Sequence, residues 1–144
     1  EKLIEIIGKD KVRFDEPLAQ YTTFRIGGPA DLFVETKTEE ELMNVWGAVR
    51  ELGIPYFVLG GGSNVLIYDK GIRGMVIKIA NNKWEIVNSK IIAEAGTSLP
   101  FLVSEPSKRG FSGLEFCVGI PGTVGGAIVG TVLTYGAVWF FNRF

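Results

Sequence analysis

The 144-residue sequence contains no histidine and only one cysteine, Cys117. Without histidine the chain has no imidazole base, no histidine metal ligand and no Ser-His-Asp triad. A lone cysteine forms no internal disulfide and no cysteine cluster, which excludes a structural zinc site of the usual kind. Unpaired cysteine is typical of a reducing compartment, so we expect a cytoplasmic protein with no bound metal.

The chain also lacks an excess of charge of either sign. Fifteen Lys and Arg residues stand against sixteen Asp and Glu residues, for a net charge of -1. Such a balance creates no overall field that would recruit nucleic acid or an anionic membrane, so we expect neither partner. The first residues, EKLIEIIGKDKVRF, carry scattered charges and do not form a signal peptide. The length suits one ordinary domain or a fragment of a larger protein.

A long run without charge begins at Phe116 and ends at Asn142. Within it, Gly122, Gly126 and Gly130 follow at four-residue spacing, which is the small-residue pattern of packed membrane helices. Pro121 and the dense glycines around it favour a loop followed by a short buried helix instead. We therefore expect no membrane span, and membrane association of this run is the competing hypothesis.

Local signals predict an alternation of strands and helices. Thr38 and Glu41 form a capping box before apolar residues at helical spacing, and Gly53 supplies the stop. A strand is expected on each side of this helix, and such a unit has parallel strands and a right-handed crossover. The expected elements are a short helix and an irregular connector ending near residue 17, strands at 31–36, 54–59 and 72–79, a hairpin of 83–87 and 91–95 around 88–90, and a helix from 98 toward 109, which Pro106 should kink or shorten.

The first glycine-rich loop follows the strand expected at 54–59. It consists of Gly60, Gly61, Gly62, Ser63, Asn64 and Val65. Consecutive glycines cost stability unless the backbone must go where a Cβ cannot. No Gly-Lys-Ser/Thr follows, so the loop is not a Walker A motif, and Val65 occupies the third glycine position of a dinucleotide fingerprint. Its amides, with Ser63 and Asn64, are suited to surround a phosphate, while the alternative is a plain strand-to-turn connection.

The second glycine-rich loop consists of Gly119, Ile120, Pro121, Gly122, Thr123, Val124, Gly125, Gly126 and Ala127. Two such loops in one small domain suggest an extended anionic ligand that is approached from both sides, with amide groups compensating a diphosphate. A dinucleotide suits this arrangement better than a mononucleotide. The alternative for the second loop is close helix packing by glycine and alanine.

Three segments, TTFRIGGPAD, VLGGGSNVLIYDKGIRGMVI and GLEFCVGIPGTVGGA, resemble in order and separation the N-terminal FAD-binding part of the UDP-N-acetylenolpyruvoylglucosamine reductases. The resemblance covers residues 18–128. It implies an α+β fold of the PCMH or vanillyl-alcohol-oxidase type, with two small α/β lobes that grip FAD. It also implies that residues 60–65 and 119–127 line the FAD diphosphate and flavin, and that Arg25, with Thr23 and Gly27, borders the same cofactor.

The family's activity, as the resemblance implies it, is a hydride transfer from NADPH to FAD and then to the enolpyruvyl double bond of a UDP-sugar. The product is UDP-N-acetylmuramate for peptidoglycan. The alternative is a flavin- or nucleotide-binding module without redox chemistry. Without the resemblance, Arg25 and Glu115 suit ordinary surface or capping roles, and Cys117 and Trp46 suit the core. The sequence assigns no role to Tyr21 or Tyr56.

After residue 128 the sequence departs from the family pattern. Thr131 stands where the family has asparagine, and Val132 and Leu133 replace small residues. The family's catalytic arginine, serine and glutamate lie beyond the matched region, so we expect no catalytic residue in this chain. The expectation is an incomplete FAD-binding domain over residues 1–144, with an atypical tail at 129–144 and no substrate-binding domain. Such a chain would not catalyse the full reaction alone, and its apolar tail would favour self-association.

Overall fold

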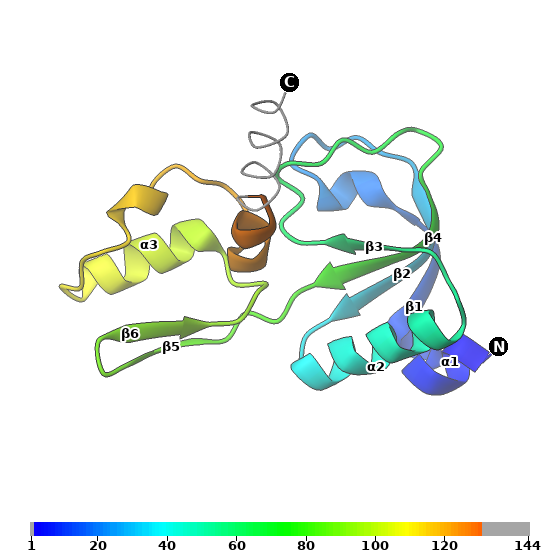
Figure 1. Cartoon of the computed structure of the whole chain (residues 1–144). Coiled ribbons are helices and arrows are strands. Elements are labelled where there is room, and N and C mark those ends of the chain that lie inside the picture. The colour runs from blue at the N-terminus through cyan, green and yellow to red at the C-terminus, as the bar shows by residue number, and fades with distance from the viewer. Residues whose placement is uncertain (1, 131–144) are drawn as a thin grey trace, which may run out of the picture. The chain divides into compact units, whose positions relative to one another are not determined.

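The structure, a computed structural model, describes residues 2–130 and divides the chain into two compact units (Figure 1). The first unit extends to Asn81, and the second begins at Asn82. Helices and strands both contribute, which confirms the α+β class. Residues 131–144 of the tail that was expected to favour self-association, including Thr131, lie outside the described residues.

A four-stranded sheet with helices on one face forms the first unit (Figure 1). Its strand order is β1-β2-β4-β3, in which β4 pairs in parallel with both β2 and β3, and β1 pairs antiparallel with β2. The predicted parallel arrangement of the strands on either side of α2 is therefore confirmed, with β4 inserted between them. The elements are α1 (Lys2–Ile7), β1 (Val12–Pro17), β2 (Pro29–Thr36), α2 (Glu39–Glu51), β3 (Tyr56–Leu59) and β4 (Ile72–Ile79), with 3-10 turns at Lys9–Lys11 and Leu18–Tyr21.

Helix α2 forms where the capping signals predict it. The Thr38 side chain accepts a hydrogen bond from the Glu41 amide at 3.1 Å, which satisfies one of the free donors of the first turn. The Glu41 carboxylate in turn accepts from the Lys37 amide at 2.7 Å, just before the cap. At the other end Gly53 takes a φ of +63°, the left-handed conformation in which glycine commonly ends a helix.

The central strands β2 and β4 bury side chains on both faces of the sheet. Val34, Met75 and Ile77 point toward α1 and α2, whereas Phe33 and Val76 belong to the cluster on the opposite face. All five side chains are at most 1% exposed. Burying an apolar side chain of this size contributes about 1.5–3 kcal/mol, so these two clusters supply most of the unit's stability.

The expected irregular connector near Pro17 was wrong, because residues 12–17 form strand β1. Only Val12 of this strand is buried, although Val12 and Phe14 alternate with Arg13 and Asp15 in the sequence VRFDEP. The strand forms because its backbone pairs with β2, from Val12 opposite Val34 to Pro17 opposite Pro29. An edge position also tolerates Pro17, which cannot donate to a ladder.

The second unit contains a hairpin, a helix and a short 3-10 turn. The hairpin of β5 (Trp84–Val87) and β6 (Lys90–Ala93) confirms the prediction, with a two-residue turn at Asn88 and Ser89. Both turn residues have positive φ, 49° and 62°, as a type I′ turn requires. The 3-10 turn spans Glu115–Cys117, and the buried Cys117 takes the predicted core position.

Helix α3 (Leu99–Lys108) begins at its predicted cap, Ser98, and runs past Pro106. The expectation that Pro106 would shorten the helix was wrong. The ring lies two residues before the end of the helix, where the missing amide removes only one hydrogen bond. The Pro106 carbonyl accepts from the Arg109 and Phe111 amides at 2.9 and 3.0 Å, which closes the end of the helix.

Candidate cofactor-binding loops

The first glycine loop lies at the carboxyl end of the edge strand β3. Of its three glycines only Gly62 has a positive φ, +67°, and Gly62 is buried while Gly61 is exposed. A Cβ added at Gly62 would lie 1.9 Å from the carbonyl oxygen of Tyr21. The close approach of the chain's own backbone therefore requires glycine at 62. A ligand is needed to account only for the glycines at 60 and 61.

Tyr21 is held in place by a polar network on the sheet face away from α2. Its ring stacks on Phe33 with centroids 4.4 Å apart. Its hydroxyl donates to Glu16 Oε1 at 2.5 Å and accepts from Arg13 at 2.6 Å. Burial and the hydrogen bond to Glu16 raise the pKa of Tyr21 to about 12, so the phenol stays protonated at neutral pH. Tyr21, to which the sequence assigned no role, thus has a structural role next to the glycine loop.

The segment that contains Arg25 lies alongside the first loop. The Thr23 amide donates to the Gly62 carbonyl at 3.0 Å, and a Cβ on Gly27 would lie 2.9 Å from the Ile67 Cβ. Arg25 is exposed, has a φ of +55°, and makes no ion pair within the described part of the chain. A non-glycine residue in the left-handed region is uncommon and concentrates at functional sites. The structure therefore brings the first two predicted segments together.

Successive backbone donors of the first loop are not used by the protein. Among residues 2–130, no acceptor is bonded to the amides of Gly61, Gly62, Ser63 and Asn64. Asn64 is exposed and Ser63 is half-buried, so their side chains stand beside these amides at the surface. Consecutive free amides are what an anion requires of a loop without charged residues.

Sequence reasoning missed Lys78, the cation nearest to this loop. Its ammonium donates to the carbonyl oxygen of Gly60 at 2.5 Å from the middle of the sheet. The side chain is half-buried, and burial lowers the pKa of Lys78, while Glu35 on the neighbouring strand acts in the opposite direction. The sequence signal that could have found Lys78 is a lysine within the apolar run of 72–79. This run is distant in sequence from the glycines.

The second glycine loop crosses the chain that leads into α3. The Leu99 amide donates to the Gly122 carbonyl at 3.0 Å, and the Val124 amide donates to the Thr97 carbonyl at 2.9 Å. A Cβ on Gly125 would lie 3.0 Å from the Cβ of Ala95, so this glycine permits a close approach of two segments. Close packing therefore accounts for Gly125.

A helix begins within this loop segment, over residues 124–130 of the described chain. Its first donors are bonded within the protein, because the amides of Val124 and Gly125 donate to carbonyls and the Gly126 amide donates to Thr123 Oγ1 at 3.3 Å. In the loop before them, the amides of Gly119, Gly122 and Thr123 have no acceptor among residues 2–130. If the backbone of this loop binds an anion, the amides of those three residues are the donors that are available. Two of the three, Gly119 and Gly122, have positive φ.

The two glycine loops belong to different units, the first before Asn81 and the second after Asn82. Each loop is described within its own unit. That both approach one ligand remains a prediction.

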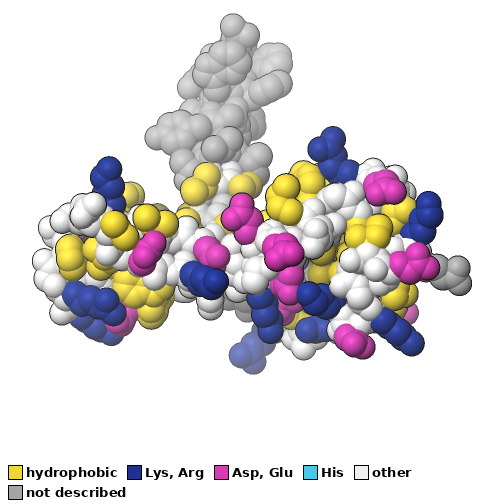
Figure 2. Space-filling model, turned by 90° about the horizontal axis from the view of Figure 1, so that it is seen from below, with side chains coloured by type: hydrophobic (Ala, Val, Ile, Leu, Met, Phe, Trp, Pro, Cys, Tyr) yellow, Lys and Arg dark blue, Asp and Glu magenta, His cyan; other side chains and the backbone are white. Residues whose placement is uncertain are grey.

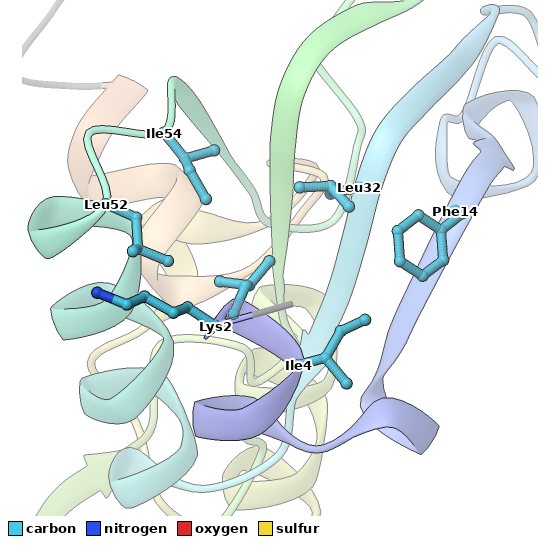
Figure 3. A pocket seen from close by; sticks show the side chains of 7 residues that line it. Lys2, Ile4, Phe14, Leu32, Leu52 and Ile54 are labelled. Atoms are coloured by element: carbon cyan, nitrogen blue, oxygen red, sulfur yellow. The ribbon is translucent and has the colours of Figure 1, made fainter.

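An apolar hollow of about 310 Å³ lies elsewhere in the first unit (Figure 3). Its lining comes from α1, β1, β2 and the residues after α2, and includes Phe14, Leu32 and Ile54, with Lys2 as its one charged residue. The hollow contains no residue of either glycine loop and is not the predicted site.

Basic and acidic side chains are interspersed on the face in Figure 2, in line with the balanced composition. Residues 2–130 contain no group of three acidic or cysteine side chains suited to a metal ion. Nor does any helix of that range have the length and apolarity to cross a membrane.

Comparison with known proteins shows the family of the chain. The family model described as FAD binding domain matches residues 30–141, which is more than half of the chain. The chain belongs to the FAD-binding domain family. The cofactor of that family is FAD, as the sequence resemblance implies.

Relatives of this FAD-binding domain carry the name UDP-N-acetylenolpyruvoylglucosamine reductase. The reductase of Clostridioides difficile is 44% identical over 136 residues, which are 93% of this chain and 45% of the relative. That of Moorella thermoacetica is 47% identical over 122 residues, which are 84% and 40%. The FAD-binding domain thus spans less than half the length of these relatives.

A solved structure supports the same family for the FAD-binding domain. The crystal structure of UDP-N-acetylenolpyruvylglucosamine reductase from Thermus caldophilus superposes with a TM-score of 0.60 at 38% identity, covering 82% of this chain and 40% of that one. An alkyldihydroxyacetonephosphate synthase superposes with a TM-score of 0.51 at 21% identity, covering 71% and 23%. The second likeness shows the fold alone.

Proposed function

We propose that this domain binds FAD and is the FAD-binding part of a UDP-N-acetylenolpyruvoylglucosamine reductase. The observation that carries the proposal is a run of four amides, from Gly61 to Asn64, that have no acceptor among residues 2–130 and lie at the carboxyl end of a parallel strand. The open end of such a sheet is where α/β proteins commonly bind nucleotides. Successive backbone donors fit a diphosphate, so the residues present suit the cofactor.

The two glycine loops have separate tasks in this proposal. Residues 60–65 hold one side of the diphosphate through their amides, supported by Ser63 and Asn64. Residues 119–127 contribute through Gly119, Gly122 and Thr123, because the amides that follow are bonded within the chain. Arg25 lies on the segment bonded to Gly62, and its exposed guanidinium is suited to pair with a phosphate.

Bound FAD supplies a ring that accepts and donates hydride. We propose that NADPH is the reductant and that the acceptor is the enolpyruvyl group of a UDP-sugar, in the cytoplasmic synthesis of peptidoglycan on which cell shape and division depend. The names of the relatives support this reading. The groups that act on the UDP-sugar are assigned to no residue of this chain, so we expect cofactor binding without the complete reaction.

The test is a titration of the 144-residue chain with FAD, followed by flavin absorbance and fluorescence. Gly61→Val places a branched side chain at an exposed position between the loop amides, and we expect it to abolish saturable binding. The matched control is Gly47→Val on the exposed surface of α2, where an added Cβ meets nothing within 4 Å. Absence of binding in the folded wild-type chain would overturn the proposal. Flavin that binds but is not reduced by NADPH would instead favour a module without redox chemistry.

A further inference from the structure

Lys78 occupies an unusual position for a lysine, in the middle of the sheet and beside the first glycine loop. It follows the buried Ile77 on β4, and its side chain lies on the same sheet face as Val76. The ammonium makes one hydrogen bond, to the carbonyl oxygen of Gly60. No ion pair of Lys78 occurs among the described residues.

Holding a cation in this place costs stability, because burial disfavours its charged form. Burial lowers the pKa of Lys78, and the Glu35 carboxylate only partly opposes that effect. An apolar residue would continue the strand pattern without this cost. A half-buried charge directed at one backbone carbonyl therefore indicates a role at the loop rather than in the core.

The carbonyl of Gly60 and the amide of Gly61 belong to one peptide group. In a planar trans peptide the C=O and the N-H point in opposite directions. A cation bonded to the oxygen draws electron density from the group, so its N-H becomes a stronger donor on the opposite side. That N-H is the first of the four amides that have no acceptor within the described chain.

The geometry points to Lys78 as a positioning residue of the anion site. We propose that its ammonium fixes and polarises the peptide between Gly60 and Gly61, so that the loop presents its amides to a diphosphate. This inference rests on the proposed function, since it assigns to Lys78 the positive charge that the loop itself lacks. Lys78 acts through the peptide and does not contact the ligand.

The experiment compares Lys78→Met with Lys78→Arg in the 144-residue chain. FAD and inorganic pyrophosphate probe the anion site, and riboflavin probes flavin binding without phosphate. We expect Lys78→Met to weaken binding of FAD and pyrophosphate about tenfold or more, as for loss of a charge-assisted hydrogen bond, and to leave riboflavin affinity unchanged. Lys78→Arg keeps the charge and should restore most of the loss. Lys70→Met, at an exposed lysine of the same unit, controls for a general change in charge.

Each outcome decides between this role and a merely structural one. Wild-type affinity for FAD in Lys78→Met would overturn the inference and leave the proposed function intact. An equal loss for FAD and riboflavin, without rescue by arginine, would show a collapsed loop and would also overturn it. If the folded wild-type chain binds no FAD, the proposed function fails and this inference fails with it. Far-UV circular dichroism of every variant establishes that the sheet is intact.

Discussion

Replacing Gly62 by alanine should destabilise the first unit much more than the same change at Gly53. The two glycines have nearly equal backbone conformations, with φ of +67° and +63°. Their surroundings differ, because an added Cβ meets the Tyr21 carbonyl oxygen at 1.9 Å at Gly62 and nothing within 4 Å at Gly53. The pair therefore separates the cost of left-handed backbone from the cost of a steric clash.

The magnitudes follow from these contacts. A Cβ in the left-handed conformation costs about 1–2 kcal/mol, and this should be the whole effect of Gly53→Ala. Gly62→Ala adds an overlap with backbone that cannot rotate away, for which about 1–3 kcal/mol is a typical cost of overpacking. We expect a total of about 2–5 kcal/mol for Gly62→Ala.

Urea unfolding of the two variants, followed by far-UV circular dichroism, measures this difference as a change in the free energy of unfolding. FAD titration of the same proteins adds a second readout, because the Tyr21 carbonyl and Thr23 would shift with the loop. If Gly62→Ala is no less stable than Gly53→Ala, the close approach of Tyr21 to the loop is wrong.

Three further predictions concern the stability of the two units. The hydrogen bonds from Lys11 and from the Lys37 amide hold the pKa of Glu41 below its usual 4.5. The resulting stabilisation is present above pH 4.5 and is lost as the pH falls. The Glu41→Gln variant should therefore lose less unfolding free energy than the wild type between pH 5 and 3, roughly the range where carboxylates titrate. Thr123→Val removes the hydroxyl that accepts from Gly126 and should cost about 1 kcal/mol in thermal unfolding, whereas an unchanged stability would exclude the cap. Phe33→Ala, at a fully buried position, should cost about 3–5 kcal/mol in urea unfolding, and a loss below about 1 kcal/mol would contradict its central place in the sheet.

Local patterns predicted the elements that local interactions stabilise. Helix α2 was found from its cap at Thr38 and its stop at Gly53, and the hairpin from its turn at Asn88 and Ser89. These signals involve neighbours in sequence, so they are readable without the fold. Strand β1 was missed because its order comes from pairing with β2, and Pro106 was misjudged because its effect depends on where α3 ends.

In the candidate site, too, local features were predicted and long-range contacts were missed. Both glycine loops and the Arg25 segment were recognised from composition, spacing and resemblance. The sequence did not separate the reasons for the glycines. Gly62 allows the close approach of the Tyr21 carbonyl and Gly125 that of Ala95, whereas the amides from Gly61 to Asn64 have no acceptor among residues 2–130. Lys78 was missed because 18 residues separate it from the carbonyl that it contacts.

By itself the sequence determined the α+β class, most element positions and the FAD-binding family, because caps, turns and glycine motifs are written in consecutive residues. Only the tertiary structure decided the strand order, the place of β1 and the contact between Lys78 and Gly60. These features depend on residues that meet only after the chain has folded, because a strand's own pattern fixes which of its faces is buried but not which strand it pairs with. The sequence thus identified the family, and the fold showed which loop amides have no acceptor within the described residues and which cation contacts the loop.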